Sequence, residues 1–232
     1  MHNIKVDREP KRLNRGRLIG VAAMVLLLVG ACQSRDEAPV TTAAPENPVA
    51  TPEEVATSFI EAYGAFDAER AISYLADDAD ISGMIGSVGA APGVEGTLKE
   101  FRLLISHLEG IGYKQMLDPC EEQGSSASGT LLRCTFNFHL LRSDEIGRGP
   151  FSGSSFLLTA HEGEIVRASV SFGIQEFSPQ MWEPFASWVS ETYPEDAEVM
   201  YEDDAYSGVR LTEESIRLWE RHSKGFVKEV GR

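Results

Sequence analysis

The chain has 232 residues, of which 42% are hydrophobic and 25% are charged. These values are typical of one ordinary globular domain with additional ends, so a second full domain is not expected. The formal net charge is −15, although residues 1–31 hold six Lys or Arg against two acidic residues. The rest of the chain is therefore strongly acidic, which argues against nucleic acids and anionic lipid head groups as partners.

The first 31 residues have the order of a secretory signal: a basic stretch, about fourteen mostly apolar residues and then small residues. The apolar run is too short for a comfortable transmembrane helix. It ends in Val29-Gly30-Ala31-Cys32, which resembles the bacterial lipobox. The resemblance implies cleavage after Ala31 and attachment of lipid to Cys32, and hence a lipoprotein anchored on the extracytoplasmic side of the cell membrane. The alternatives are an uncleaved signal anchor and a plain signal peptide with a chance cysteine.

Residues 32–50 are rich in Pro, Ala and Thr and contain no large apolar residue beyond two valines. They predict a disordered tether between the anchor and the folded part, because they cannot bury enough apolar surface to become ordered. Order is expected to begin at Thr51-Pro52-Glu53-Glu54, a capping box with proline at the first helical position. A helix should follow directly.

Two further helices are expected before any strand. Asp67 is placed to cap a short helix with the sequence AERAISYLA, which would end at Asp77-Asp78-Ala79-Asp80. Residues 82–96 contain five glycines and predict a flexible loop at the rim of a pocket. A third helix is expected from Thr97, and its apolar side chains are those of Leu98, Phe101, Ile105 and Leu108.

From Tyr113 onward the apolar period changes to two. The sequence TLLRCTFNFHLL, residues 130–141, alternates strictly and predicts a strand with one buried face. That face carries Leu132, Cys134, Phe136, Phe138 and Leu140. Strands are expected near residues 113–121, 130–142, 151–161 and 164–175. Successive strands joined by tight turns form an antiparallel sheet, and the preceding helices would cover its apolar face, so the predicted fold class is α+β.

Two cysteines flank the predicted turn GSSASG. In an antiparallel hairpin centred near Ala127, Cys120 and Cys134 lie directly opposite each other. Opposed pairs have Cβ separations close to those of a disulfide. Outside the cytoplasm we expect the two thiols to be joined, which would stabilise the fold by roughly 3 kcal/mol. Two buried free thiols are the alternative.

The segment FIEAYGAFDAERAISYLADDADI, together with the order of elements over residues 51–177, resembles the SnoaL-like, nuclear transport factor 2 type of cone. The resemblance implies a curled antiparallel sheet packed on three N-terminal helices, with a pocket between sheet and helices and often a homodimer through the outer sheet face. Residues 178–232 lie beyond this fold and predict a C-terminal helical extension whose last helix is capped by Thr212. This extension is similar to uncharacterised secreted actinobacterial proteins.

Ketosteroid isomerase shares the same cone, so its catalytic positions can be compared with this sequence. Its base falls on Gly83 and its oxyanion tyrosine falls on Phe59. An enolate needs a base and a hydrogen-bond donor, so this activity is excluded for the chain. The sequence also lacks HExxH, CxxC and GxSxG spacings, a phosphate-binding GK(S/T) ending and the calcium-loop pattern around Asp203 and Asp204. No metal or cofactor is expected.

The side chains expected to line a pocket in the cone are mainly aromatic. The candidates are Phe59, Tyr63, Asp80, Phe101, His107, Phe136, Phe138 and Phe172. His139 and His161 alternate onto the polar face and are expected to contact solvent or a partner.

Three functional hypotheses follow from this pattern. The first is a non-catalytic module that binds a small apolar ligand in the cone or a protein on the outer sheet face. The second is a SnoaL-like cyclase or isomerase that acts on a lipid-like or polyketide-like molecule, with Asp80 or His107 as base. The third is a cone that is packed solid and serves only assembly.

Overall fold

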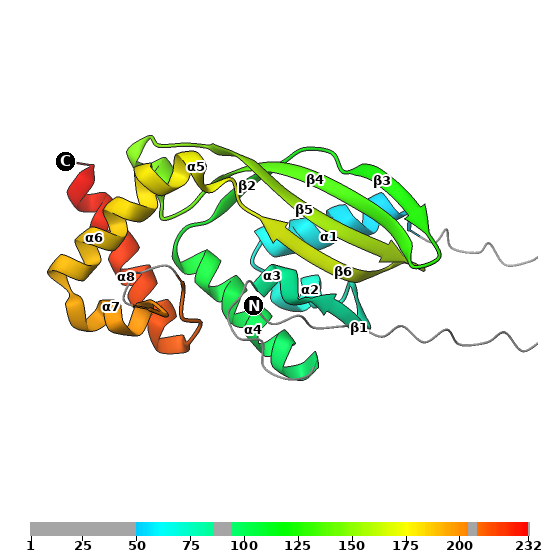
Figure 1. Ribbon diagram of the computed structural model, residues 1–232, viewed down its shortest axis with the longest axis horizontal. Helices are drawn as coiled ribbons and strands as arrows, with labels where there is room; N and C mark the ends of the chain where they lie inside the picture. Colours follow the sequence, from blue (N-terminus) through cyan, green and yellow to red (C-terminus); the bar gives the residue numbers. More distant parts are fainter. Residues whose placement is uncertain (1–49, 86–93, 204–207, 232) are drawn as a thin grey trace, which may run out of the picture. The chain divides into compact units, whose positions relative to one another are not determined.

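The computed structural model describes residues 50–85, 94–203 and 208–231. The expected signal segment, Cys32 and the tether up to residue 49 therefore lie outside the described residues, as do most of the glycine-rich loop and residues 204–207. In chain order the elements are α1 (Pro52–Gly64), α2 (Ala68–Ile72), β1 (Leu75–Ile81), α3 (Ser82–Ile85), α4 (Val94–Gly110), β2 (Lys114–Leu117), β3 (Glu121–Ser126), β4 (Gly129–His139), η1 (Ser143–Ile146), β5 (Phe151–His161), β6 (Glu164–Ser171), α5 (Ile174–Phe177), η2 (Ser178–Trp182), α6 (Glu183–Thr192), α7 (Pro194–Met200) and α8 (Glu213–Val230) (Figure 1).

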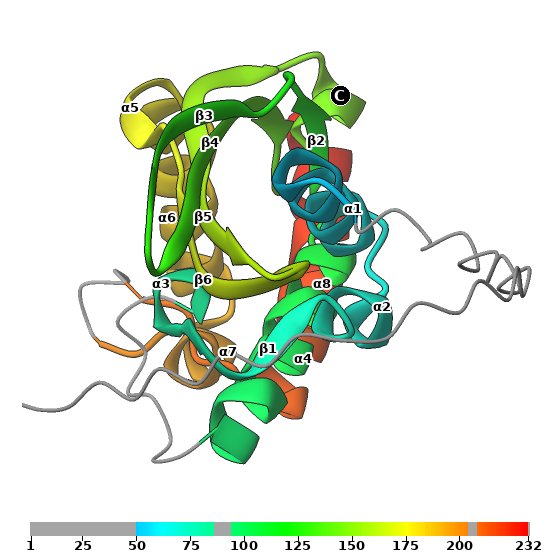
Figure 2. The ribbon, with the colours of Figure 1, turned by 90° about the vertical axis from the view of Figure 1, so that its right-hand side faces the viewer.

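The strands form one sheet with the neighbour order β1-β6-β5-β4-β2, and β3 also pairs with β4. The pairs among β4, β5 and β6 are antiparallel, whereas β1 joins the edge of β6 in parallel. Figure 2 shows that the sheet is curled, with α1 along its open side, and α1 contacts β4, β5 and β6. The predicted α+β class, with a curled antiparallel sheet, N-terminal helices and a C-terminal helical extension, is confirmed.

The alternation of β4 places its apolar side chains inside the curl, as predicted. Phe136 and Phe138 are 1% and 0% exposed, whereas Leu131 on the opposite face is 39% exposed. Successive strand residues point to opposite faces, so the apolar side chains at every second position of β4 all face the helices and pack against them. The outer face carries three exposed large apolar side chains: Met116, Leu131 and Leu157.

The predicted helix caps at Thr51 and Thr212 are present. The Glu54 backbone N–H donates to Thr51 Oγ1 at 3.2 Å, and the Thr51 backbone N–H donates to Glu54 Oε2 at 2.8 Å. The Ser215 backbone N–H donates to Thr212 Oγ1 at 3.2 Å at the start of α8. These bonds satisfy backbone donors that a helix leaves unpaired at its first turn.

The second predicted helix is too long, because only its first part is helical. Asp67 caps α2 as expected, but α2 ends at Ile72 and the segment LADDADI forms β1. The backbone N–H of Ile165 donates to Tyr74 O at 2.8 Å, and Leu75 then pairs with Ile165 in the β6 register. The edge of β6 thus supplies hydrogen-bond partners for the backbone of LADDADI. The strand propensity of the segment itself does not reveal them. Residues 82–85 of the predicted loop form the short helix α3, and the helix predicted from Thr97 is α4, which begins at Val94.

The prediction of one continuous strand over residues 113–121 is also wrong. It is divided into β2 and β3, with Pro119 among the residues between them, and proline cannot donate a ladder hydrogen bond. The turn is shorter than GSSASG because β3 extends to Ser126 and β4 begins at Gly129. Glu121 pairs with Arg133, so the hairpin is centred where it was predicted, and the Cys120–Cys134 disulfide is present.

The other strand ends differ in the same way. β4 ends at His139 and β6 ends at Ser171, short of the predicted residues 142 and 175. The chain then turns into α5, which directly precedes the C-terminal extension. Gly173 allows this turn, because a Cβ there would lie 2.0 Å from the Ser152 carbonyl oxygen.

The C-terminal extension packs around Trp219 of α8, which is fully buried. Phe185 and Trp182 stack on this indole with ring centroids 5.3 and 5.6 Å away. His222 Nε2 lies 2.8 Å from Asp196 Oδ2 and so connects α8 to α7. Within the described ranges, no helix is both long and apolar enough to cross a membrane.

Candidate functional site

The interior of the curl is filled by aromatic rings. Tyr63 contacts Phe101, Tyr113 and Phe156 with centroid distances of 6.2, 6.1 and 5.5 Å. Phe136 stacks on Phe156 at 4.7 Å. Rings at these separations leave no room for a ligand.

Several expected pocket residues therefore belong to the core. Phe59, Tyr63 and Phe101 are fully buried, and Phe136 is 1% exposed. They pack against one another, and none of them is among the residues that line the two cavities described next. Phe138 is also buried, but it lies nearer the end of the curl, where it contacts Phe172 at 5.2 Å.

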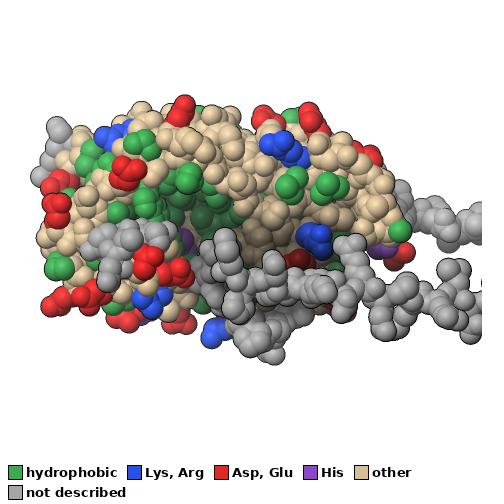
Figure 3. Space-filling model, viewed as in Figure 1, with side chains coloured by type: hydrophobic (Ala, Val, Ile, Leu, Met, Phe, Trp, Pro, Cys, Tyr) green, Lys and Arg blue, Asp and Glu red, His purple; other side chains and the backbone are tan. Residues whose placement is uncertain are grey.

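Open space lies instead between the end of the sheet and the C-terminal extension. Two cavities occur there, an inner one of about 260 Å³ and an outer one of about 380 Å³. Leu140, Phe172 and Trp182 line both of them, so the two cavities adjoin. We call them together the crevice. Figure 3 shows hydrophobic side chains gathered in a hollow between the sheet and the C-terminal helices.

The inner cavity is built from segments that are far apart in the chain. α3 contributes Met84 and Ile85, and α4 contributes Leu104 and Leu108. The remaining sides come from β6 and from the segment before α8, through Val170, Val209 and Leu211. The walls are apolar because these elements turn their hydrophobic faces toward one another without meeting completely.

The outer cavity lies beside α5. Its lining includes Phe138, Phe177, Ile174 and Ser178. Ile174 is 55% exposed and gives the outer cavity a hydrophobic rim. The crevice therefore continues from the cavity beside α4 to the cavity beside α5.

Trp182 stands where the two cavities meet. It is the last residue of η2, a single turn of π-helix, and π-helical turns are frequent at functional sites. Its indole stacks on Trp219 and contacts Tyr201 edge-on at 6.0 Å. These contacts hold the ring in place as a wall of the crevice.

His107 is the titratable residue of the crevice. Its side chain is 5% exposed, lines the inner cavity and meets the Trp219 ring edge-on at 5.3 Å. Nδ1 is buried and has no hydrogen-bond partner among the described residues. Burial lowers the pKa of His107 from 6.5 to about 4, so the imidazole is neutral at neutral pH. It provides an uncharged hydrogen-bonding group in an otherwise apolar wall.

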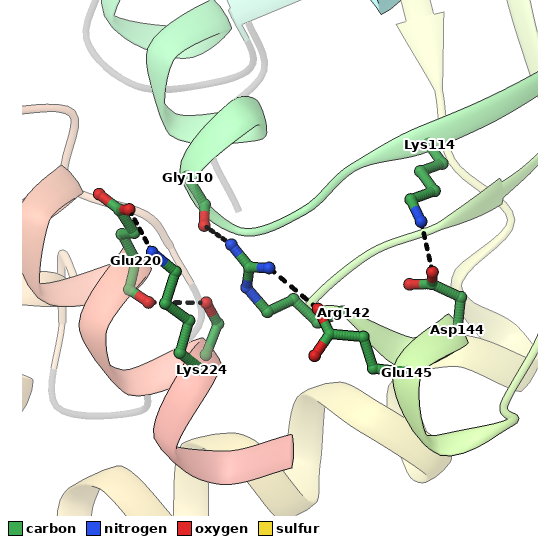
Figure 4. Close-up of polar contacts among 8 residues, drawn as sticks. Gly110, Lys114, Arg142, Asp144, Glu145, Glu220 and Lys224 are labelled. Atoms are coloured by element: carbon green, nitrogen blue, oxygen red, sulfur yellow. Dashed lines mark hydrogen bonds and ion pairs between the residues drawn. The ribbon is translucent and has the colours of Figure 1, made fainter. Parts of the chain in front are cut away.

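Polar contacts hold the helix that carries His107. The Arg142 guanidinium donates to Gly110 O at 3.2 Å and to Glu145 Oε1 at 2.9 Å (Figure 4). The Arg142 backbone N–H also donates to Ile111 O at 3.1 Å. Carbonyl groups at the end of a helix lack partners within the helix, so these bonds fix the end of α4 one turn beyond His107.

Asp80 lies away from His107. It accepts hydrogen bonds from the Ser82 side chain and backbone at 2.7 and 3.2 Å, and Arg167 Nε lies 3.5 Å away. The Ser82 hydrogen bonds and the Arg167 charge hold the Asp80 pKa below its usual value. Its side chain is 53% exposed and lines a different cavity, together with Asp77.

The three titratable candidates are thus not brought together. Asp80 and His107 line different cavities, and Tyr63 is buried among aromatic rings with no hydrogen-bond partner for its hydroxyl in the described structure. His139 makes local contacts, with Nδ1 at 3.1 Å from both Ser143 Oγ and the Arg148 carbonyl oxygen. His161 is on the surface. In the described part of the chain, no group of three or more His, Cys, Asp or Glu side chains could hold a metal.

Sequence reasoning missed Trp182, Leu140 and the segment before α8 as crevice residues. The sequence of residues 178–232 predicted only a helical extension, without indicating which of its side chains would line a cavity. The sequence did contain one sign of the crevice. His107 lies next to Leu104 and Leu108 on an otherwise apolar face of α4.

No protein-family model matches this chain, and no curated protein matches it. Its structure is similar to that of an NTF2-like protein of unknown function from Cytophaga hutchinsonii, with 15% identity, a TM-score of 0.38, and coverage of 57% of this chain and 98% of the other. It is also similar to IdmH, a candidate polyketide cyclase from Streptomyces antibioticus, with 19% identity, a TM-score of 0.39, and coverage of 57% and 99%. A cystatin-fold protein from Novosphingobium aromaticivorans shares 19% identity, with a TM-score of 0.34 and coverage of 51% and 96%.

Proposed function

We propose that the folded part of this chain is a binding module that holds a small, mainly apolar molecule in the crevice. The observation that carries this proposal is the buried imidazole of His107 in the wall of the inner cavity, whose Nδ1 has no hydrogen-bond partner among the described residues. Buried polar groups in proteins are nearly always hydrogen-bonded, and an unpaired one costs roughly 1–3 kcal/mol. A ligand that hydrogen-bonds to His107 would remove this cost.

The size of the crevice is compatible with this role. Small-molecule sites typically have volumes of about 300–1,000 Å³ and mostly apolar walls with a few polar groups. The inner cavity, at about 260 Å³, is slightly below this range, but it adjoins the outer cavity of about 380 Å³. Together they could enclose most of a small molecule.

A cyclase or isomerase acting on a lipid-like or polyketide-like substrate is the second candidate. The neutral imidazole of His107 would be its base, because Asp80 lines another cavity. An efficient general base has a pKa near the working pH, whereas burial lowers the pKa of His107 to about 4. Binding without chemistry is therefore the better supported function.

Mass spectrometry of molecules that co-purify with the full chain tests the binding role. Val170→Trp should fill the inner cavity and abolish co-purification, since Val170 lines that cavity. Leu157→Trp is the matched control, because Leu157 is 42% exposed on the outer sheet face. Equal recovery from wild type and Val170→Trp would contradict the proposed site. Recovery of a chemically altered ligand from wild type, but not from His107→Leu, would favour the enzyme.

We also propose that a lipid on Cys32 anchors the module on the extracytoplasmic side of the membrane. The order of segments in residues 1–32 supports this proposal, and the Cys120–Cys134 disulfide is compatible with an oxidising compartment. Metabolic labelling with a palmitate analogue should mark the wild-type chain and not Cys32→Ala. Labelling of Cys120→Ala should match wild type. Equal labelling of wild type and Cys32→Ala would rule out this anchor.

A further inference from the structure

We infer that the ligand of the crevice is an uncharged, elongated molecule with one hydrogen-bonding group, held with that group on His107 and with its apolar body along Trp182. This inference rests on the proposed function and names the chemical class of the ligand. Three features of the crevice support it: the lack of charged side chains among the described residues of its walls, the chemistry of the imidazole and the arrangement of the two cavities.

The first feature is the lack of charge on the walls, as far as the described part of the chain forms them. None of the described residues that line the inner or the outer cavity is Asp, Glu, Lys or Arg. The polar side chains of the lining are those of His107 and Ser178. A carboxylate or an ammonium group in this crevice would lose its hydration without gaining a partner of opposite charge, and that loss is larger for an ion than for a neutral polar group. The walls therefore select against charged ligands.

The second feature is the neutral imidazole. A neutral imidazole has one nitrogen that donates and one that accepts, and the tautomer depends on its partner. A hydroxyl group both donates and accepts, so it can pair with His107 in either tautomer. A hydroxyl on a mainly apolar molecule thus satisfies the ring without bringing a charge into the crevice.

The third feature is the shape of the space. Phe172, Leu140 and Trp182 are shared by the linings of the two cavities, whereas His107 lines only the inner one. A ligand with its polar group at His107 must extend past Trp182 to use the outer cavity. There it meets Phe138, Phe177 and Ile174, which are apolar. The geometry favours a chain-like body over a compact one.

Isothermal titration calorimetry with matched eight-carbon probes tests this inference on the purified full chain. The probes are 1-octanol, octanoate, octylammonium and 1-chlorooctane. The same titrations with Val170→Trp, which fills the inner cavity, identify the binding that belongs to the crevice. We expect 1-octanol to bind there at least about tenfold more tightly than octanoate or octylammonium, because either ion would be buried without a partner.

Two variants of His107 test the role of the ring. His107→Leu should weaken 1-octanol binding by about three- to tenfold, the effect of one hydrogen bond, and leave 1-chlorooctane within about twofold. His107→Gln retains a hydrogen-bonding side chain and should keep the preference for the alcohol. Trp182→Ala leaves His107 in place and should weaken 1-octanol and 1-chlorooctane alike. It provides a test that does not depend on the folding of the His107 variants.

The possible outcomes separate the inference from the proposed function. If no probe binds in a way that Val170→Trp abolishes, the proposed function fails. If octanoate or octylammonium binds in the crevice as tightly as 1-octanol, the crevice is a binding site but the inference of an uncharged ligand is overturned. If His107→Leu weakens 1-octanol and 1-chlorooctane equally, the hydrogen bond to His107 is overturned.

Discussion

Replacement of His107 by leucine should remove part of the acid sensitivity of the fold. Burial lowers the pKa of His107 from 6.5 to about 4 in the folded chain. Between these two pH values the unfolded chain binds a proton at His107 that the folded chain does not bind. The free energy of unfolding therefore falls as the pH falls through this window, and it rises as the pH is raised. The lowered pKa corresponds to about 3 kcal/mol lost between pH 6.5 and 4.

Leucine fills a similar space and cannot be protonated, so His107→Leu should not lose this contribution. The difference in free energy of unfolding between His107→Leu and wild type should grow by about 3 kcal/mol in favour of the variant from pH 7 to pH 4. Urea denaturation followed by tryptophan fluorescence at a series of pH values measures this difference. The other titrating groups are present in both proteins, so their effects cancel to the extent that they do not interact with His107.

His161→Gln provides the control, since it removes a histidine whose side chain is 45% exposed. Its stability should follow that of wild type over the whole pH range. A difference between His107→Leu and wild type that stays constant from pH 7 to pH 4 would refute the argument, because it would show that the buried imidazole gains its proton as readily in the folded chain as in the unfolded one.

Three further predictions concern the sheet. The double variant C120S/C134S should lower the free energy of unfolding by roughly 3 kcal/mol through loss of the disulfide, and an unchanged urea midpoint without reductant would contradict this. Phe136→Ala should cost about 3–5 kcal/mol because Phe136 is 1% exposed in the aromatic core, and a loss below about 1 kcal/mol in the same assay would show that the interior is loosely packed. Dimerisation through the outer sheet face stays a prediction. Leu157 is 42% exposed on that face, so Leu157→Glu should convert a dimer to a monomer in sedimentation-velocity measurements. Identical profiles for Leu157→Glu and wild type would exclude this face.

Sequence alone determined the features that depend on local periodicity. The strict alternation of residues 130–141 predicted the buried face of β4, since strand side chains alternate between two faces whatever the neighbours are. The capping residues Thr51, Asp67 and Thr212 predicted three helix starts because a cap acts within one turn. The spacing of Cys120 and Cys134 about the turn predicted their pairing for the same local reason.

Propensity failed where the rest of the fold supplied the partner. LADDADI contains three aspartates, which are poor strand formers, yet it forms β1 because the β6 edge offers backbone hydrogen bonds. The aromatic residues expected around a pocket could not be sorted by sequence either. Whether Tyr63 or Phe136 lines a cavity or fills it depends on how closely their rings approach Phe156, and those distances are set by the curl of the sheet.

The crevice was decided by tertiary structure alone. Its walls come from α3, α4, the sheet and the C-terminal extension, and His107 and Trp182 are separated by more than seventy positions in the chain. No periodicity links such positions, since each element repeats only its own pattern of inward and outward side chains. The apolar residues of each element indicated that one face of the element is buried. Only the packing of the extension against the end of the sheet decided which of these residues face the crevice.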